Sequence, residues 1–121
     1  MSIMSRALLN SHLGDLLALP EQQFLYLSTI GWRSGRKHKI EIWFVQRGGR
    51  YYLMSENRER AHWVQNILHD RAVSFDVDDR SLAGTGQVIR KGPIADDVKK
   101  LMRKKYDWDS GLIVELAPEN S

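Results

Sequence analysis

The sequence predicts a single α+β, mainly β domain: a six-stranded antiparallel split β-barrel with flanking helices. Short segments rich in β-branched and aromatic residues recur along the chain, separated by tight turns that contain glycine or aspartate. Only two internal segments change to a helical period, and there is no internal repeat or linker. Six short strands and two intervening helices within 121 residues favour a small closed or split barrel.

The composition excludes several classes of protein. With 42% hydrophobic and 27% charged residues, residues 1–121 have the composition of one soluble globular domain. There is no cysteine, which excludes a disulfide framework and a thiolate nucleophile. The N-terminal stretch has neither a signal peptide nor a membrane span, so we expect a cytoplasmic protein without stable membrane insertion. A net charge of +3 suits a small anionic ligand at least as well as nucleic acid, which usually requires a denser basic face.

The elements follow in order along the chain. Leucines at three- and four-residue spacings before Pro20 predict an N-terminal helix over residues 3–18, within a segment 1–20. The predicted strands cover residues 23–30, 38–46, 51–55, 72–77, 81–89 and 112–116. The first three strands should form an antiparallel meander, since Gly48 and Gly49 suit a tight hairpin turn. Helical spacing predicts helices over residues 56–70, capped by Asn57, and over residues 94–106.

A glycine-containing basic loop connects the first two strands at residues 31–37, here called the basic loop. Gly31 and Gly35 free the backbone to turn and to present its N–H groups. Its cationic and hydroxyl side chains, with those that follow it, are Arg33, Ser34, Arg36, Lys37, His38 and Lys39. These donors suit phosphate or carboxylate oxygens, so the loop predicts an anion site. A solvated basic turn that binds nothing is the alternative interpretation.

Other familiar sites are not supported by the spacing. The basic loop lacks the Gly-Lys-Ser/Thr ending of a nucleotide-binding loop and joins two strands, not a strand to a helix. His62 and His69 lie two helical turns apart, roughly 10 Å, so one metal ion cannot bind both directly. We therefore expect no metal site.

Two tryptophan-containing segments suggest a ligand wall. Trp63 belongs to the apolar row of the first internal helix, so we expect it in the core ahead of any role in ligand binding. Asn66, three residues on, could cap a neighbouring loop or bind the edge of a ligand. Trp43 points to the opposite sheet face from Ile42 and Phe44. That face could be a ring-stacking wall or a dimer surface.

The segment from Leu27 to Arg36 resembles the Thr-Thr-Gly-Arg-(Lys/Arg)-Ser-Gly-Arg signature of the deazaflavin-dependent nitroreductase family, whose enzymes use coenzyme F420. The resemblance continues through residues 40–44, 49–53, 63–66, 83–86 and 105–106, and covers roughly residues 24–116. It implies a split β-barrel of the pyridoxamine-phosphate-oxidase type. It also implies hydride transfer from reduced F420 to a small quinone, nitro or enone acceptor.

The resemblance also implies site residues. The anionic tail and phosphate of the cofactor would contact Arg33, Ser34, Gly35, Arg36 and Lys37. The ring would lie against Ile42, Trp43, Ser55, Trp63 and Asn66. Trp32 replaces a usual cation of the signature, and residues 56–62 form a shorter loop than in some members. FMN therefore remains an alternative cofactor, and a non-catalytic carrier an alternative function. We expect a homodimer, and no catalytic residue is assigned.

Overall fold

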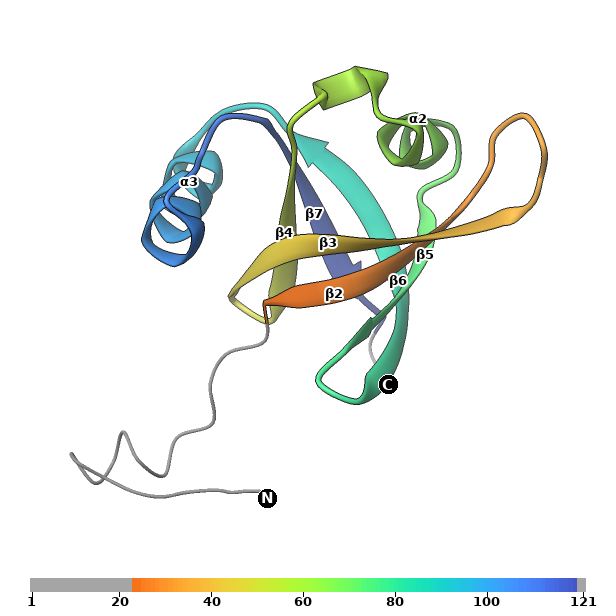
Figure 1. Ribbon diagram of the computed structural model, residues 1–121, viewed down its shortest axis with the longest axis horizontal. Coiled ribbons are helices and arrows are strands. Elements are labelled where there is room, and N and C mark those ends of the chain that lie inside the picture. The colour runs from red at the N-terminus through yellow and green to blue at the C-terminus, as the bar shows by residue number, and fades with distance from the viewer. Residues whose placement is uncertain (1–22, 120–121) are drawn as a thin grey trace.

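The structure, a computed structural model, describes residues 23–119, which form a closed antiparallel β-barrel with helices outside it (Figure 1). The strands are β2 (Phe24–Ile30), β3 (Lys37–Arg47), β4 (Arg50–Ser55), β5 (Ala72–Val77), β6 (Arg80–Ile89) and β7 (Leu112–Pro118). The helices are the 3-10 helix η1 (Arg58–Arg60), α2 (His62–His69) and α3 (Pro93–Tyr106). The predicted fold class is confirmed. The helix predicted over residues 3–18 lies outside the described residues.

The strands close in the order β2-β3-β4-β7-β6-β5, with β5 paired back onto β2. Every neighbouring pair is antiparallel. The predicted meander of the first three strands is confirmed, and Gly48 and Gly49 form the β3–β4 turn with φ of 59° and 76°. Both values lie in the left-handed region, which glycine occupies without a steric cost.

The barrel interior follows from the two-residue period of its strands. On β2, Leu25 and Leu27 are buried while Phe24 and Tyr26 are exposed. The inward rows of the other strands complete one apolar core, which includes Phe44, Leu53, Phe75, Val114 and Leu116. Helix α2 covers one end of this core through Val64 and Ile67.

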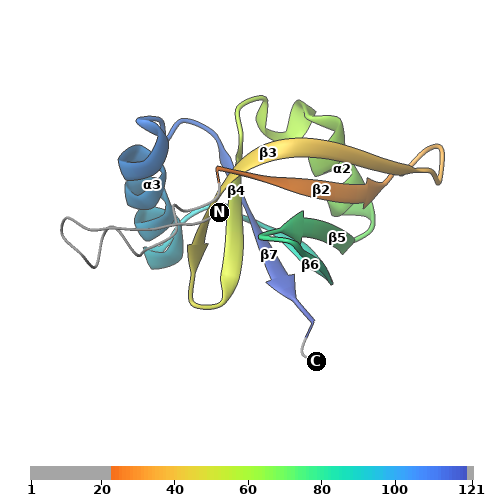
Figure 2. The same ribbon diagram turned by 60° about the horizontal axis from the view of Figure 1, so that its bottom comes forward.

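Helix α3 buries its apolar side against the outer surface of the barrel. Ala95, Val98 and Met102 pack on outward-facing residues of β3, β4 and β7 (Val45, Tyr52, Met54 and Ile113). Pro93 occupies the start of the helix, where its missing N–H costs no hydrogen bond. Figures 1 and 2 show the two helices apart from each other, α3 at the left and α2 toward the right. No helix in the described part of the chain is long and apolar enough to cross a membrane.

The single helix predicted over residues 56–70 is wrong in its first half. Arg58 has a positive φ of 53° and Ala61 is extended with ψ of 134°, so the chain makes a 3-10 turn before α2 begins at His62. Asn57 makes no side-chain cap. Two local hydrogen bonds replace the helical pattern, because the Ser55 hydroxyl donates to the Arg58 carbonyl and Gln65 Nε2 donates to the Glu59 carbonyl. The η1 segment thereby becomes a wall beside α2.

Candidate functional site

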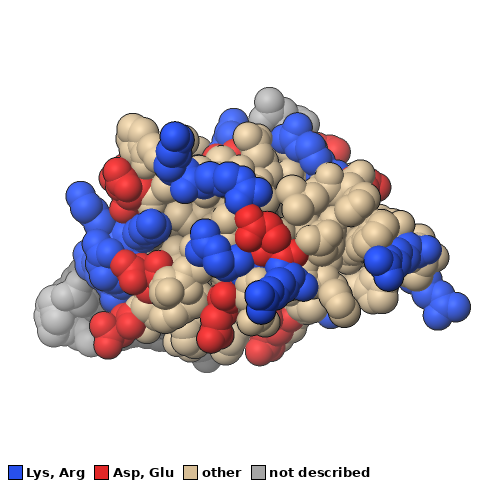
Figure 3. All heavy atoms as spheres, turned by 90° about the horizontal axis from the view of Figure 1, so that it is seen from above, with Lys and Arg blue, Asp and Glu red and all other residues tan. Residues whose placement is uncertain are grey.

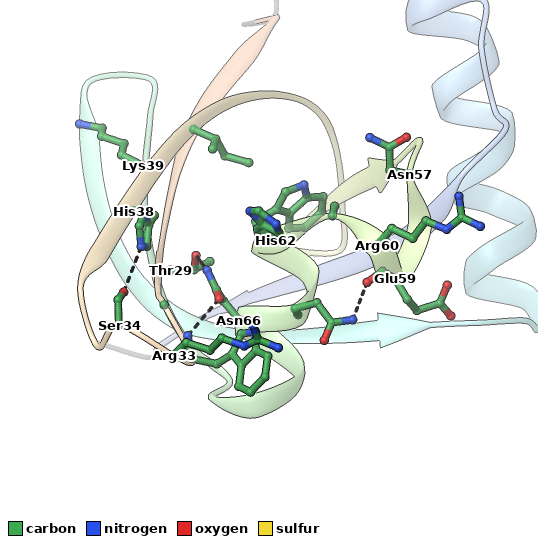
Figure 4. Close-up of a pocket in the computed structure, with 16 residues that line it drawn as sticks. Thr29, Arg33, Ser34, His38, Lys39, Asn57, Glu59, Arg60, His62 and Asn66 are labelled. Carbon is green, nitrogen blue, oxygen red and sulfur yellow. Dashed lines mark hydrogen bonds between the residues drawn. The ribbon is translucent and has the colours of Figure 1, made fainter.

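A large cavity lies between the basic loop, the η1 segment and α2, and is here called the loop cavity (Figure 4). Its volume is about 1020 Å³. Its walls come from the basic loop (Gly31, Trp32, Arg33, Ser34), the flanking strands (Thr29, His38, Lys39, Ile40), the η1 segment (Asn57, Glu59, Arg60, Ala61) and α2 (His62, Trp63, Gln65, Asn66). Ligand sites typically measure about 300–1,000 Å³, so this cavity is large enough for a cofactor-sized molecule.

The basic loop is compact because glycine occupies two positions, 31 and 35, where a larger residue would clash or be strained. The Gly31 N–H donates to the Arg36 carbonyl at 2.7 Å, and the Gly35 N–H donates to the Gly31 carbonyl at 2.8 Å. A side chain at position 31 would place its Cβ 2.5 Å from Ser34 Oγ. Gly35 has φ of 71°, in the left-handed region. The backbone therefore turns sharply and keeps its side chains on the outside.

Asn66 fastens this loop to α2. Its Oδ1 accepts the Trp32 backbone N–H at 3.1 Å, and its Nδ2 donates to Thr29 Oγ1 at 3.0 Å. The residue is only 5% exposed. Figure 4 shows Asn66 between Thr29 and the loop residue Arg33. Of the two roles that the sequence allowed for Asn66, the structure shows the contact to a neighbouring loop.

Trp32 forms an aromatic layer at the outer edge of the loop cavity. Its ring stacks on His69 of α2, with centroids 4.2 Å apart and planes 10° apart. The Arg33 guanidinium carbon lies 4.4 Å from the centroid of the Trp32 ring. The His69 ring is itself held, because its Nδ1 lies 2.8 Å from the Gln65 carbonyl oxygen. Trp32 thus replaces the cation of the family signature with a surface that supports Arg33.

The loop cavity has an excess of positive charge. Arg33, Lys39 and Arg60 line it, and within residues 23–119 neither Arg33 nor Arg60 forms a salt bridge. Glu59 is the only carboxylate among the described lining residues, and its hydrogen bond with Arg90 holds the pKa of that carboxyl below its usual range. Figure 3 shows Lys and Arg side chains protruding at the end of the molecule that carries the basic loop.

The structure brings together only part of the predicted site. Arg33, Ser34, Trp63 and Asn66 line the loop cavity. The other loop residues, Gly35, Arg36 and Lys37, belong to the same loop and the start of β3 but are not among its lining residues. Ser55 is buried, and its hydroxyl is used by the Arg58 carbonyl at 3.0 Å. Ser55 therefore supports the η1 segment from beneath.

Ile42 and Trp43 line a second cavity, here called the aromatic cavity. Its volume is about 560 Å³, and its described lining residues are Phe24, Glu41, Ile42, Trp43, Met54, Glu56, Tyr106 and Trp108. These two predicted ring contacts are thus separated from Trp63 and Asn66. The reason is their position on β3. Ile40 and Ile42 both point inward, but Ile40, two residues before Ile42, is the one that lines the loop cavity.

The aromatic cavity is built around stacked rings. Trp43 stacks on Tyr106 with centroids 4.4 Å apart and planes 3° apart, and Trp108 meets Trp43 edge-on at 6.5 Å. Tyr106 is fixed from below, because its hydroxyl oxygen accepts the Phe44 N–H at 3.0 Å. Lys105 Nζ donates to the Phe44 carbonyl at 2.9 Å. Tyr106 at the end of α3 and Trp108 beyond it therefore line one side of the cavity, and the rest comes from β2, β3, β4 and Glu56.

Sequence reasoning missed several lining residues. Thr29, Arg60 and His62 of the loop cavity, and Tyr106 and Trp108 of the aromatic cavity, were not assigned to a site. Lys39 and His38, which follow the basic loop directly and were predicted among its anion-binding donors, both line the loop cavity. No local pattern indicates that Tyr106 meets Trp43, 63 positions earlier in the sequence. No group of three or more His, Asp or Glu side chains within residues 23–119 is arranged to hold a metal ion.

Comparison with known proteins shows what the chain resembles. The model of a family described as F420H(2)-dependent quinone reductase matches residues 6–109. No curated protein matches the chain. Among solved structures, an F420-H2 dependent reductase, FDR-A, has a TM-score of 0.66 at 19% identity, covering 83% of this chain and 98% of that one.

Two further solved structures share the fold. A putative pyridoxamine 5'-phosphate oxidase from Listeria innocua has a TM-score of 0.66 at 14% identity, covering 82% of this chain and 86% of that one. A structure described as a domain-swapped dimer has a TM-score of 0.65 at 20% identity, covering 87% and 86%. At these identities the likeness shows the fold alone.

The role of Asn66 as a fastener of the basic loop predicts the effect of its removal. Asn66→Ala leaves the partly buried Trp32 N–H and the buried Thr29 hydroxyl without this partner, which should lower the free energy of unfolding by about 1–3 kcal/mol. Urea titration measures that loss. Hydrogen exchange at the Trp32 amide should also become faster in the folded variant. Leu68→Ala, an exposed change on the same helix, is the control and should change neither quantity appreciably. Unchanged Trp32 exchange in Asn66→Ala would contradict the assignment.

Proposed function

The chain belongs to the F420H(2)-dependent quinone reductase family, whose model matches residues 6–109, and from this premise we propose that it is an F420-dependent oxidoreductase. It transfers a hydride from reduced F420 to a small quinone, nitro or enone acceptor. The observation that carries the proposal within the structure is the positive excess of the loop cavity. Positive charge in the loop cavity would stabilise the phosphate and carboxylate groups of an anionic cofactor bound there.

The residues of the loop cavity suit the anionic part of the cofactor. Arg33 and Arg60 lie on different walls, on the basic loop and on η1, and neither is paired with a carboxylate of residues 23–119. The backbone N–H groups of Arg33 and Ser34 have no acceptor in the described part of the chain. Guanidinium groups and unpaired N–H groups are the donors that phosphate and carboxylate oxygens bind. Arg36 and Lys37 add positive charge on the same loop.

The apolar wall of the loop cavity suits a flat ring. Trp63 and Ile40 face it from α2 and from β3, and both also pack on the barrel core. Their positions are therefore fixed by packing and not by the ligand. Bound reduced F420 supplies the hydride for the reaction. The contribution of the chain is to bind the cofactor through its cations, to orient the ring against fixed side chains and to exclude water from one side of it.

The direct test of the proposed function is turnover. The protein mixed with reduced F420 and menadione should oxidise the cofactor well above the protein-free rate, followed by the return of the absorbance of oxidised deazaflavin. Omission of the quinone gives the background. Tight F420 binding with no acceleration for any quinone, nitro compound or enone would leave a carrier. Binding of FMN and not of F420 would transfer the proposal to an FMN oxidoreductase on the same fold.

Arg33 provides the sharpest single test of the loop cavity. A charge-assisted hydrogen bond contributes about 1.5–3 kcal/mol, so Arg33→Ala should weaken F420 binding roughly 10- to 100-fold. The melting temperature of the cofactor-free protein should hardly change, because the side chain is exposed. Lys100→Ala removes an exposed cation from α3, outside both cavities, and should leave the affinity unchanged. Equal affinity of Arg33→Ala and the unmodified protein in a titration would remove Arg33 from the site.

We also propose that the protein is a homodimer that pairs through the outer face of β2 and β3. Tyr26 and Ile30 are 44% and 36% exposed on that face, where Glu41 and Lys37 of β3 pair with them. Exposed apolar side chains that share one sheet face indicate an interaction site. The similar structure described as a domain-swapped dimer is consistent with pairing.

Light scattering at micromolar concentration should therefore give the mass of a dimer. Ile30→Lys places a charge on the proposed face and should shift the protein to the mass of a monomer. Leu68→Lys, which changes a side chain 48% exposed on α2, is the matched control and should leave the dimer intact. A monomeric mass for the unmodified protein, with and without cofactor, would refute the proposed dimer.

A further inference from the structure

The aromatic cavity differs from the loop cavity in charge. Glu41 and Glu56 line it, and no Lys or Arg is among its described lining residues. Lys105 lies nearby, 5.2 Å from the centroid of the Tyr106 ring, and its Nζ is directed at the Phe44 carbonyl oxygen and does not line the cavity. The loop cavity, by contrast, has Arg33 and Arg60 without carboxylate partners among the described residues. The two cavities are therefore lined by charges of opposite sign.

The two cavities are neighbours. Glu56 lines the aromatic cavity and the next residue, Asn57, lines the loop cavity. On β3, Ile40 lines the loop cavity and Ile42 the aromatic cavity. Two residues on a strand are separated by roughly 7 Å. A ligand in the aromatic cavity would thus lie beside a cofactor in the loop cavity, at the boundary formed by these two pairs.

We infer that the aromatic cavity binds the hydride acceptor, and that Glu41 and Glu56 select acceptors by charge, admitting flat uncharged or cationic rings and rejecting anionic ones. The identity of the ligand as the hydride acceptor rests on the proposed function, whereas the charge preference of the cavity does not depend on it. With the basic loop cavity beside it, this arrangement sorts two ligands: the anionic cofactor is directed to one cavity and excluded from the other.

The stacking surface explains the preference for a flat ring. Trp43 is 39% exposed although it is stacked on Tyr106, and Trp108 stands edge-on beside it. Aromatic rings favour offset-stacked and edge-on neighbours, so a planar acceptor gains contact here without a change in these side chains. A cationic ring would gain further from the faces of the aromatic rings.

The carboxylates explain the preference for charge. Glu41 Oε1 accepts the Tyr26 hydroxyl at 3.0 Å, which holds this carboxylate in place on the outer face of β3. Glu56 has no hydrogen-bond or salt-bridge partner within residues 23–119. An anionic acceptor in the aromatic cavity would meet both negative charges, and the repulsion persists over several ångströms even in water.

Equilibrium binding without cofactor tests the charge preference by itself. Menadione and a sulfonated naphthoquinone share one ring system and differ in charge, and each is titrated against the tryptophan fluorescence of the full chain. The sulfonate should bind roughly three- to tenfold more weakly. Glu56→Gln and Glu41→Gln should each reduce that ratio. Asp96→Asn, an exposed carboxylate on α3 outside both cavities, is the matched control and should leave the ratio unchanged.

The location is tested with tryptophan variants. Trp43→Phe keeps a ring in the stack but removes the fluorophore, so menadione should quench the variant less than it quenches Trp32→Phe. Equal affinity for the two quinones, tighter binding of the sulfonate, no binding of either, or an equal shift in Asp96→Asn would overturn the inference. Absence of turnover together with the expected binding preference would refute the proposed function and leave the charge selection of the aromatic cavity supported.

Discussion

The hydrogen bonds of the Asn66 side chain determine whether there is a loop cavity. The basic loop and α2 are separate in the sequence, and this one buried amide joins them through Trp32 and Thr29. In a low-dielectric environment such a pair of hydrogen bonds is stronger than in water. The free-energy cost of leaving their buried donors and acceptors unsatisfied exceeds the net stabilisation that the formed bonds contribute. The position of Arg33 depends on the same attachment, because its guanidinium lies over the ring of Trp32.

The second constraint is the alternation of side chains along β3. Ile40, Ile42 and Phe44 point toward the barrel interior, whereas Glu41 and Trp43 point outward. One strand therefore contributes to the core, to the loop cavity and to the aromatic cavity. Because the core packing fixes the backbone, the side chains that face the two cavities are placed without any ligand. Such preorganisation lowers the entropic cost of binding.

The fold does not by itself specify the chemistry. Proteins with this barrel include a pyridoxamine-phosphate-oxidase-like structure and an F420-H2 dependent reductase, each less than 20% identical to this chain. What distinguishes members of such a fold is the set of side chains at its openings. Here those are Arg33 and Arg60, without a carboxylate partner within residues 23–119, in one cavity, and carboxylates with stacked rings in the other. These two sets of side chains, together with the family to which the chain belongs, support the proposed redox enzyme with two ligands.

The barrel was largely determined by local patterns. Alternating residues predicted all six strands of the described region, and β5 matches its predicted bounds of residues 72–77, because a strand that buries one face must alternate. Gly48 and Gly49 were readable as a hairpin turn, since few other residues accept their backbone angles. The predicted helix over residues 56–70 failed in its first half because the hydrogen bonds of Ser55 and Gln65 to the η1 carbonyls override helical spacing.

Some features of the candidate site could likewise be predicted from the sequence, and others could not. The sequence by itself identified the basic loop, since glycine and clustered cations are local features, and it singled out Asn66 and Trp43 as residues with two possible roles. Only the tertiary structure shows which distant residues these two side chains meet. Asn66 lies inward against Trp32 and Thr29, and Trp43 lies on Tyr106, 63 positions later in the sequence. Periodicity places a side chain on a face of its own element, but which distant residue meets that face is decided by how the barrel closes and where α2 and α3 pack on it.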